Sequence, residues 1–562
     1  MEINSSSHST HHKAGIINRN AQMTPCAPPM GRPIVSRIRS TRFALCRRQF
    51  PAVAVWDGLR FCPNRQSERH SSSKSPSALL ELTPLPQTLK QQAAEVVHSD
   101  LPSGTSVTVN GWIRTIRKHK KHAFVNISDG SYDKVLQLVF TDPEQVDDLS
   151  VGVSLKVNGT IQRRKNLADP YEILVDNYDV IGGVPEEEPY PLQNKYLSQD
   201  YLRRELPTIR FRSLSNGVTM RFRSRAVSEL SRYFEENEFI QTHPPLITSS
   251  DCEGAGEVFT VVSESSATPF FGKKGYLTVS TQLHLEALMM GLSRVWTLAP
   301  AFRAEKSITS RHLSEFWMLE AEVAFVNRLE HIMSLVEGLL RTALRRLKES
   351  GELNSVLSVK TFLEKQKLHD GEGEDKDQEI THAQVLQRWD GMLRDSAWKR
   401  ITYKHAVDVL QQAESEGKAR FETSAEYGDN LKSEHEKWLA SQYAHGPIFV
   451  TQYPSQLKPF YMLPTPGSNG ETVECFDLLV PDLGELVGGS LREYDYKRLK
   501  ATIERVDMDS SELEWYAELR KWGSVPHGGF GIGFERLISY LVGIYNIRDV
   551  IAFPRWVNHC VC

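Results

Sequence analysis

The chain has 562 residues, of which 40% are hydrophobic and 24% charged, and its formal net charge is −3. One hydrophobic core rarely serves so long a chain, so two or more domains are expected. No apolar run approaches the roughly 18 residues of a membrane span, so we expect no membrane partner. Only Cys252 and Cys475 of the seven cysteines lie between residues 63 and 559, which disfavours a disulfide framework or a zinc site.

Residues 1–80 differ in composition from the rest of the chain. Up to Arg65 they carry ten Lys and Arg but only Glu2 and Asp57 as acids. An Arg-rich, Ser-rich and acid-poor leader is typical of an organellar transit peptide. The alternative is a disordered basic tail that contacts RNA. We expect import into the mitochondrial matrix rather than into a plastid.

A small barrel is predicted for residues 95–185. Between Ser106 and Ile181 five short alternating segments are separated by turn signals, which is typical of an OB-fold. Basic residues follow the first segment, next to Phe124: Arg114, Arg117, Lys118, Lys120 and Lys121. Cations and an aromatic ring suit single-stranded nucleic acid, whereas a basic turn alone would more often be solvated.

A second domain is predicted for residues 208–556, after a proline- and acid-rich linker at 186–207. It opens with a helix that carries apolar residues on one face: Val218, Phe222, Ala226, Leu230 and Phe234. Their spacing is near 3.6 residues. The following FIQTHPPLI predicts a strand whose Pro244 and Pro245 lie at an edge or an end.

Two further patterns point to phosphate chemistry. Residues 298–325 predict two antiparallel strands joined by a loop with Arg303 and Arg311 at its ends. Guanidinium groups bind phosphate bidentately, although two surface arginines in an ordinary hairpin are the alternative. Asp477 and Glu485 supply paired carboxylates of the kind that hold Mg²⁺, and Arg536 lies on an apolar helix where its charge needs a partner.

Three motifs in order resemble those of class II aminoacyl-tRNA synthetases, and within that class the asparaginyl enzymes. FRAE at 302–305 with RHLSEFWMLEAEVAF at 311–325 resembles the second signature motif, and GFGIGFER at 529–536 resembles the third. The helix before FIQTHPPLI resembles the first, which forms the homodimer interface in the family. The resemblance implies an α+β fold, with an OB-fold barrel followed by an antiparallel sheet flanked by helices.

The resemblance also implies an ATP site. Arg303 would hold the α-phosphate and the amino-acid carboxylate, and Phe316 would stack on adenine. Arg303, Arg536 and Lys458 would be catalytic, and Asp477 and Glu485 would bind the metal. The implied ATP-binding set is Arg303, Glu305, Arg311, His312, Leu313, Phe316, Glu485 and Arg536.

The amino-acid site carries the specificity prediction. By resemblance, Glu253 in a mobile loop meets the substrate ammonium together with Ser280, Gln282 and Glu320. Aspartyl enzymes carry a lysine where this chain has Leu285, and Glu286 follows it. We expect Glu286 to accept from a substrate amide and Arg492 to donate to its oxygen, which favours asparagine over aspartate.

In the barrel, Phe124 would stack on the middle anticodon base, and Gln137 and Glu172 would read base edges, with Arg114 beside them. The implied function is an asparagine–tRNA ligase that uses ATP and Mg²⁺ to form asparaginyl-adenylate and charges tRNA(Asn). Its rivals are an aspartyl-tRNA synthetase, a catalytically silent RNA-binding relative and an asparagine synthetase on the same fold. The chain departs from the family in its last residues, WVNHCVC, near the implied adenine pocket.

Overall fold

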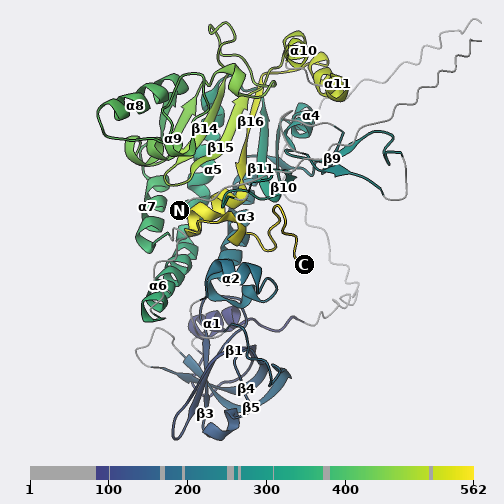
Figure 1. Cartoon of the computed structure of the whole chain (residues 1–562). Coiled ribbons are helices and arrows are strands. Elements are labelled where there is room, and N and C mark those ends of the chain that lie inside the picture. The colour runs from purple at the N-terminus through teal and green to yellow at the C-terminus, as the bar shows by residue number, and fades with distance from the viewer. Residues whose placement is uncertain are drawn as a thin grey trace, which may run out of the picture. The chain divides into compact units, whose positions relative to one another are not determined.

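The computed structural model describes residues 84–99, 101–164, 171–192, 197–249, 258–263, 268–307, 309–370, 380–505 and 510–562 (Figure 1). The basic leader, the acidic run at 371–379 and Glu253 lie outside these residues, so the predictions for them stay predictions. Within the described part, no helix combines the length and apolar character that crossing a membrane requires.

The N-terminal domain is a closed five-stranded barrel, as the sequence predicted. Its strands follow the order β1-β2-β3-β5-β4 and are antiparallel except for the β3–β5 pair. Alternate residues such as Val125, Leu138 and Val157 fill its interior, which is the period of two expected of half-buried strands. The strands are β1 Ser106–Lys118, β2 Ala123–Ser128, β3 Leu136–Phe140, β4 Ser154–Arg163 and β5 Tyr171–Gly182.

Helix α1 (Leu89–His98) precedes the barrel and belongs to its core. Thr88 caps the first turn, and its backbone N–H donates to the Gln91 side chain in return. Leu89 and Val96 of the helix are buried in the barrel core. Helix α1, part of which precedes residue 95, therefore packs with the barrel, and the domain bounds at 95–185 stay a prediction.

The second domain is built on an eight-stranded sheet in the order β12-β13-β14-β15-β16-β11-β10-β6 (Figure 1). Its inner pairs are antiparallel, and the outermost pair at each edge is parallel. The predicted hairpin is confirmed as β10 and β11. The strands are β6 Ile240–Gln241, β10 Arg294–Phe302, β11 Glu315–Ala324, β12 Lys399–Thr402, β13 Ile448–Thr451, β14 Cys475–Val480, β15 Gly484–Leu491 and β16 His527–Gly533.

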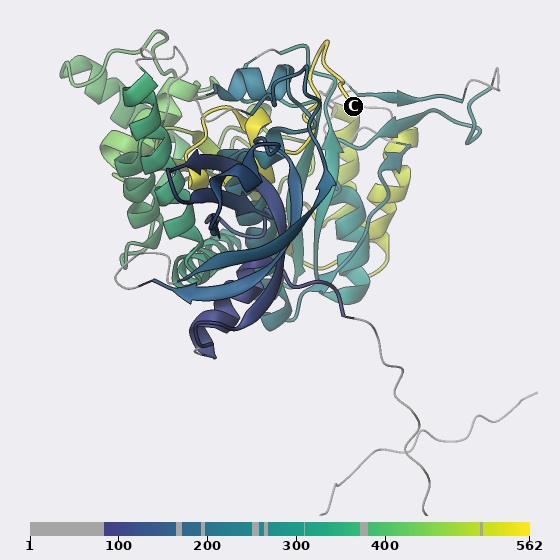
Figure 2. The ribbon, with the colours of Figure 1, turned by 90° about the horizontal axis from the view of Figure 1, so that it is seen from below.

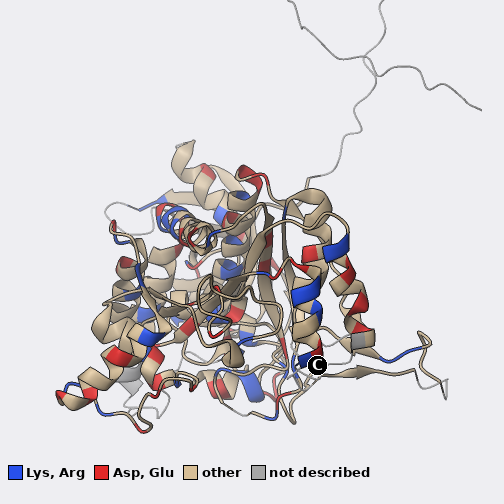
Figure 3. Ribbon diagram, turned by 90° about the horizontal axis from the view of Figure 1, so that it is seen from above, with Lys and Arg blue, Asp and Glu red and all other residues tan. Residues whose placement is uncertain are grey.

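Helices cover this sheet and share its main core. In α3 (Leu214–Glu236) every residue of the predicted apolar face is buried, and α12 (Phe534–Val542) buries Phe534, Leu537 and Ile538. Acidic and basic residues are interspersed over the helices (Figure 3). The other helices are α2 Gln199–Arg204, α4 Gln282–Leu292, α5 Leu329–Glu349, α6 Glu352–Asp370, α7 His382–Leu393, α8 Tyr403–Ser415, α9 Ser433–Trp438, α10 Tyr496–Arg505 and α11 Ser510–Glu518.

The segment FIQTHPPLI differs from the single strand that its apolar residues suggest. Only β6 and β7 (Ile247–Thr248) have strand structure, and Pro244 and Pro245 lie between them. Proline lacks the N–H that a ladder needs, so the prolines interrupt the strand. Strand β7 joins β9 (Gly275–Leu277) and β8 (Thr260–Val261) in a small sheet, which reaches away from the main sheet (Figure 2).

Candidate active site

A cavity of about 320 Å³ lies over β11, β15 and β16. It gathers side chains that are as far apart in the chain as Ser280 and Ile547. The predicted ATP, metal and amino-acid residues therefore meet at one place. Those that line the cavity are Ser280, Gln282, Arg303, Glu305, Arg311, His312, Leu313, Phe316, Glu320, Lys458, Asp477, Glu485, Arg492 and Arg536.

Glycines on β15 and β16 leave room for side chains beside and beneath the cavity. A Cβ at Gly529 would clash with the Glu322 carboxylate and the Ala321 carbonyl, and one at Gly489 would clash with the Phe476 ring. A Cβ at Gly488 would lie 3.4 Å from Glu485 Oε1 and 3.9 Å from Asp477 Oδ1. Only glycine leaves these spaces to neighbouring side chains and to a ligand.

Three arginines give one end of the cavity a positive charge. The Arg303 guanidinium lies 5.6 Å from the centre of the Phe316 ring, and Arg311 Nη1 donates to Ser433 Oγ at 2.6 Å. Burial lowers the pKa of Arg311, and the neighbouring charge of Arg536 lowers it further. Like charges held together around a cavity indicate a site for an anion.

His312 lies beside these arginines in the loop between β10 and β11. Its Nδ1 is 3.0 Å from Ser307 Oγ, and its Nε2 is 3.4 Å from Glu305 Oε2. Burial lowers the pKa of His312, and the Arg536 charge adds to this effect while Glu305 opposes it. The neutral imidazole is thereby favoured, with Glu305 and Ser307 fixing its position.

Carboxylates border the same end of the cavity. Lys458 Nζ donates to both Asp477 oxygens at 2.7 and 2.9 Å, and Arg536 Nη1 lies 3.6 Å from Glu485 Oε2. Glu436 on α9, which the sequence did not single out, accepts from the Glu485 backbone N–H at 3.2 Å. Burial, then the charge of Glu485, raises the pKa of Glu436 to about 7. Three carboxyl groups thus lie close together here, and two of them are paired with cations.

Glu320 forms the centre of the predicted ammonium site. It accepts hydrogen bonds from the hydroxyls of Ser280 and Thr281 and from the Thr281 backbone N–H at 3.0 Å. Gln282 Nε2 donates to Glu286 Oε1 at 3.0 Å. Because the amide nitrogen is turned to Glu286, the carbonyl oxygen of Gln282 is left as an acceptor on the cavity side.

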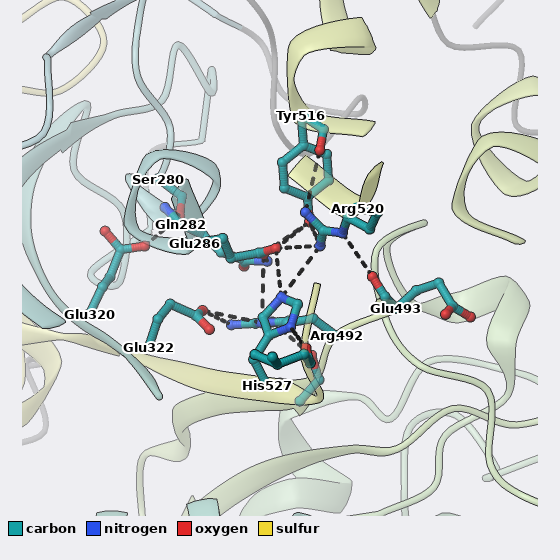
Figure 4. A network of polar contacts seen from close by, with 12 residues as sticks. Ser280, Gln282, Glu286, Glu320, Glu322, Arg492, Glu493, Tyr516, Arg520 and His527 are labelled. Atoms are coloured by element: carbon teal, nitrogen blue, oxygen red, sulfur yellow. Dashed lines mark hydrogen bonds and ion pairs between the residues drawn. The ribbon is translucent and has the colours of Figure 1, made fainter. Parts of the chain in front are cut away.

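Glu286 does not line the cavity; it lies among Gln282, Tyr516, Arg520 and His527 (Figure 4). It is fully buried and accepts from Gln282, from the Tyr516 hydroxyl at 2.8 Å and from Arg520, while His527 Nε2 lies 3.1 Å away. Burial alone would raise the pKa of Glu286, but the Arg520 charge and His527 outweigh burial and lower it. The direct amide contact predicted from the sequence would require these bonds to break.

Glu322, which the sequence analysis did not single out, lines the cavity in its place. Its Oε1 accepts from Arg492 Nη2 and, at 3.2 Å, from Arg492 Nε. Its Oε2 is buried and has no hydrogen-bond partner among the described residues. Burial raises the pKa of Glu322, whereas the Arg492 guanidinium, which donates twice to Oε1, opposes this shift and favours the carboxylate. The signal was present, because Glu320 and Glu322 are two residues apart on a strand and so share a face.

In the barrel, the predicted anticodon residues divide into two groups. Gln137 Nε2 donates to Glu172 Oε2 at 2.8 Å, and the Phe124 ring meets His119 edge-to-face at 5.5 Å. Phe124, Gln137 and Glu172 alternate with interior residues, so they share the outer surface. Arg114 instead occupies a bulge in β1, and its Nη1 donates to the Arg212 carbonyl at 2.5 Å.

Comparisons with known proteins agree with this architecture. Residues 199–557 match the family model of class II tRNA synthetases (D, K and N), and residues 107–181 match that of the OB-fold nucleic acid binding domain. The chain therefore belongs to the class II tRNA synthetases. Within that class it belongs with the asparagine–tRNA ligases, which are ATP-dependent enzymes, as similarity to individual proteins shows.

The mitochondrial asparagine–tRNA ligase of Saccharomyces cerevisiae is 42% identical over 83% of this chain and 95% of its own length. That of Schizosaccharomyces pombe is 40% identical over 81% and 95%. The crystal structure of asparaginyl-tRNA synthetase from Pyrococcus horikoshii, complexed with asparaginyl-adenylate, matches with a TM-score of 0.69. It is 29% identical, and the match covers 81% of this chain and 96% of that one.

Proposed function

We propose that this chain activates asparagine with ATP in the cavity described above and transfers the asparaginyl group to tRNA(Asn). The unpaired Glu322 Oε2 beside Arg492 carries the specificity assignment. A side-chain amide offers N–H donors and a carbonyl acceptor, whereas a carboxylate offers only acceptors. Glu322 would accept from the amide N–H and would repel aspartate, and Arg492 would donate to the amide oxygen.

At the other end of the amino acid, the ammonium group would lie among Ser280, Gln282 and Glu320. These oxygens are suitable partners for a buried cation, which would cost several kcal/mol if left unpaired. Glu253 would join them from its loop. We assign Glu286 the role of orienting Gln282, because its carboxylate holds the Gln282 amide nitrogen.

The cationic end of the cavity would bind the triphosphate, with Phe316 and Leu313 against adenine. The asparagine carboxylate would attack the α-phosphate in line, which releases pyrophosphate and forms the adenylate. Arg303, Lys458 and Arg536 would neutralise the charge that develops on the phosphates. The terminal ribose hydroxyl of tRNA would then accept the acyl group, so no side-chain nucleophile is required.

The residues present fit Mg²⁺ at the phosphate end. Asp477 and Glu485 border the space that Gly488 leaves open. Burial, and then the charge of Glu485, raises the pKa of the neighbouring Glu436. The described residues hold no cluster of three or more protein ligands. Mg²⁺ is usually held by one or two carboxylates together with substrate phosphates. Bound there, it would offset phosphate charge.

The outer barrel surface with Phe124, Gln137 and Glu172 would read the anticodon. Two copies of the chain would pair through the segment around β6 and β7, where Ile240 and Ile247 are exposed. The leader at 1–80 would direct the chain to the mitochondrial matrix. The mitochondrial names of the two yeast relatives support this location.

ATP–pyrophosphate exchange with asparagine or aspartate as the only amino acid tests the proposed function. The purified chain should exchange label with asparagine far faster than with aspartate, and it should then charge tRNA(Asn). A preference for aspartate would identify the aspartyl rival. No exchange with either amino acid, in a chain that still binds tRNA, would favour the silent RNA-binding rival.

A further inference from the structure

The last residues of the chain fold into a closed turn around Trp556. The Trp556 N–H donates to the His559 carbonyl at 3.3 Å, and the His559 N–H donates to the Trp556 carbonyl at 2.9 Å. The two rings stack with centres 3.5 Å apart and planes 13° apart. Arg555 Nη1 and Nη2 donate to the carbonyls of Val561 at 3.0 Å and Cys562 at 3.1 Å. The tail is therefore an ordered part of the domain.

Trp556 is also anchored to the body of the domain. It is 7% exposed, and the guanidinium groups of Arg203, Arg204 and Arg548 lie 5.9, 5.9 and 4.5 Å from the centre of its ring. Cations over an indole face attract it electrostatically. Arg548 belongs to the short helix η6 (Ile547–Asp549). The tail is thus tied to α2 and to η6.

The same tail contacts the loop that carries Arg311 and His312. The Ser314 N–H donates to the Arg555 carbonyl at 2.7 Å, while the Ser314 carbonyl accepts from the Arg303 N–H at 3.0 Å. The Ile547 N–H donates to the Ser310 carbonyl at 3.0 Å. Ile547 also lines the cavity and packs with Leu313. The C-terminal segment therefore holds the loop at both Ser310 and Ser314.

We propose that Trp556 is a positioning residue for ATP. Its contacts with Arg548 and His559 fix η6 and Arg555, which hold the β10–β11 loop against the cavity. The inference rests on the proposed function, because it assigns this loop to the triphosphate. Without the Trp556 ring, the β10–β11 loop would be less ordered in the free protein. ATP would then have to order the loop when it binds, and this cost would weaken its affinity. Among the described residues, Glu320 and Glu322 at the asparagine end form no hydrogen bond or ion pair with the tail, so asparagine binding should change much less than ATP binding.

Steady-state pyrophosphate exchange tests this proposal with Trp556→Ala, Trp556→Phe and Trp522→Ala. Trp522 is 82% exposed, so its truncation is a matched control. Trp556→Ala should raise KM for ATP by about tenfold and leave KM for asparagine within about twofold. Trp556→Phe keeps an aromatic face and should recover most of the loss, and Trp522→Ala should match the wild type.

An unchanged KM for ATP in folded Trp556→Ala would overturn the proposal. A fall in kcat with both KM values unchanged would also overturn it, because fewer folded molecules give that pattern. If Trp556→Ala does not fold, His559→Ala is the substitute, because it removes only the ring stack. This variant should raise KM for ATP about threefold. An unchanged KM for ATP would contradict the proposal. A wild type without asparagine-dependent exchange would refute the proposed function instead. The role of Trp556 would then be tested by measuring the affinity of the same variants for ATP by calorimetry.

Discussion

At the scale of single residues, Glu436, which lies next to Glu485 at the arginine-rich end of the cavity, has a strongly raised pKa. Its pKa is raised to about 7 from an ordinary value of 4.5, first by burial and then by Glu485, with Asp477 adding to the effect and Arg536 opposing it. Between these pH values the folded state binds a proton that the unfolded chain has lost. The free energy of unfolding should therefore fall as the pH rises from 4.5 to 7.

We predict that Glu436→Gln removes this pH dependence. Between pH 5 and 7.5 the wild type should lose about 2–3 kcal/mol more of its unfolding free energy than the variant does, since one pKa unit corresponds to about 1.4 kcal/mol. Urea unfolding at the two pH values measures the difference. Glu504→Gln, at an exposed glutamate of α10, is the control. Parallel pH curves for wild type and Glu436→Gln would contradict the assigned environment.

The residues that the sequence could identify are those whose chemistry is tied to a motif. Arg303, Phe316 and Arg536 line the cavity where their motifs placed them. Glu286 was expected to contact the substrate amide but does not line the cavity, because spacing along the chain does not show which residues line a cavity and which lie behind its lining. Tyr516, Arg520 and His527 surround it from more than 200 residues away, and no local pattern signals such a contact.

At the scale of elements, a strand could be predicted where apolar and polar residues alternate without interruption. The barrel strands and the β10–β11 hairpin alternate over many residues, and the structure confirms them. In FIQTHPPLI the prolines reduce the strand to two short pieces, and their sheet partners could not be predicted. The short α9 has no long apolar face, so nothing in the sequence indicated that it places Ser433 and Glu436 beside the cavity.

A substitution in the barrel tests whether tRNA binding is separate from amino-acid activation. Phe124→Ala should weaken tRNA binding by about 1–3 kcal/mol, the scale for one lost base stack, and leave pyrophosphate exchange without tRNA nearly unchanged. Filter binding and exchange assays on the same preparation measure the two effects. Val135→Ala removes an exposed apolar side chain elsewhere on the barrel and is the control. An equal loss in both assays would make Phe124 a folding residue.

At the scale of the whole molecule, the targeting role of the leader can be tested separately from the activity of the enzyme. Residues 1–80 fused to a fluorescent reporter should direct it to mitochondria, because their basic, acid-poor composition suits import. A fusion with Arg37, Arg39 and Arg42 replaced by glutamine should be imported less well. Microscopy with a mitochondrial marker measures both. A diffuse cytosolic signal from the unaltered leader would instead favour the RNA-binding tail.

The central claim is that the cavity distinguishes asparagine from aspartate, so that the chain attaches the correct amino acid to the tRNA that the barrel would bind. Both substitutions Glu322→Gln and Glu286→Gln replace a buried carboxylate, but only Glu322 lines the cavity. Glu322→Gln removes the charge that should repel aspartate. Glu286→Gln disturbs Gln282 and Arg492, whose Nε lies 3.9 Å from Glu286 Oε1, and both residues would contact either substrate.

The most direct measurement is the ratio of kcat/KM for asparagine and aspartate in pyrophosphate exchange. Glu322→Gln should lower this ratio by at least about tenfold, or roughly 1.4 kcal/mol, with KM for ATP nearly unchanged. Glu286→Gln should weaken both amino acids together and keep the ratio close to that of the wild type. A wild-type ratio in Glu322→Gln, or a collapsed ratio in Glu286→Gln alone, would contradict the account.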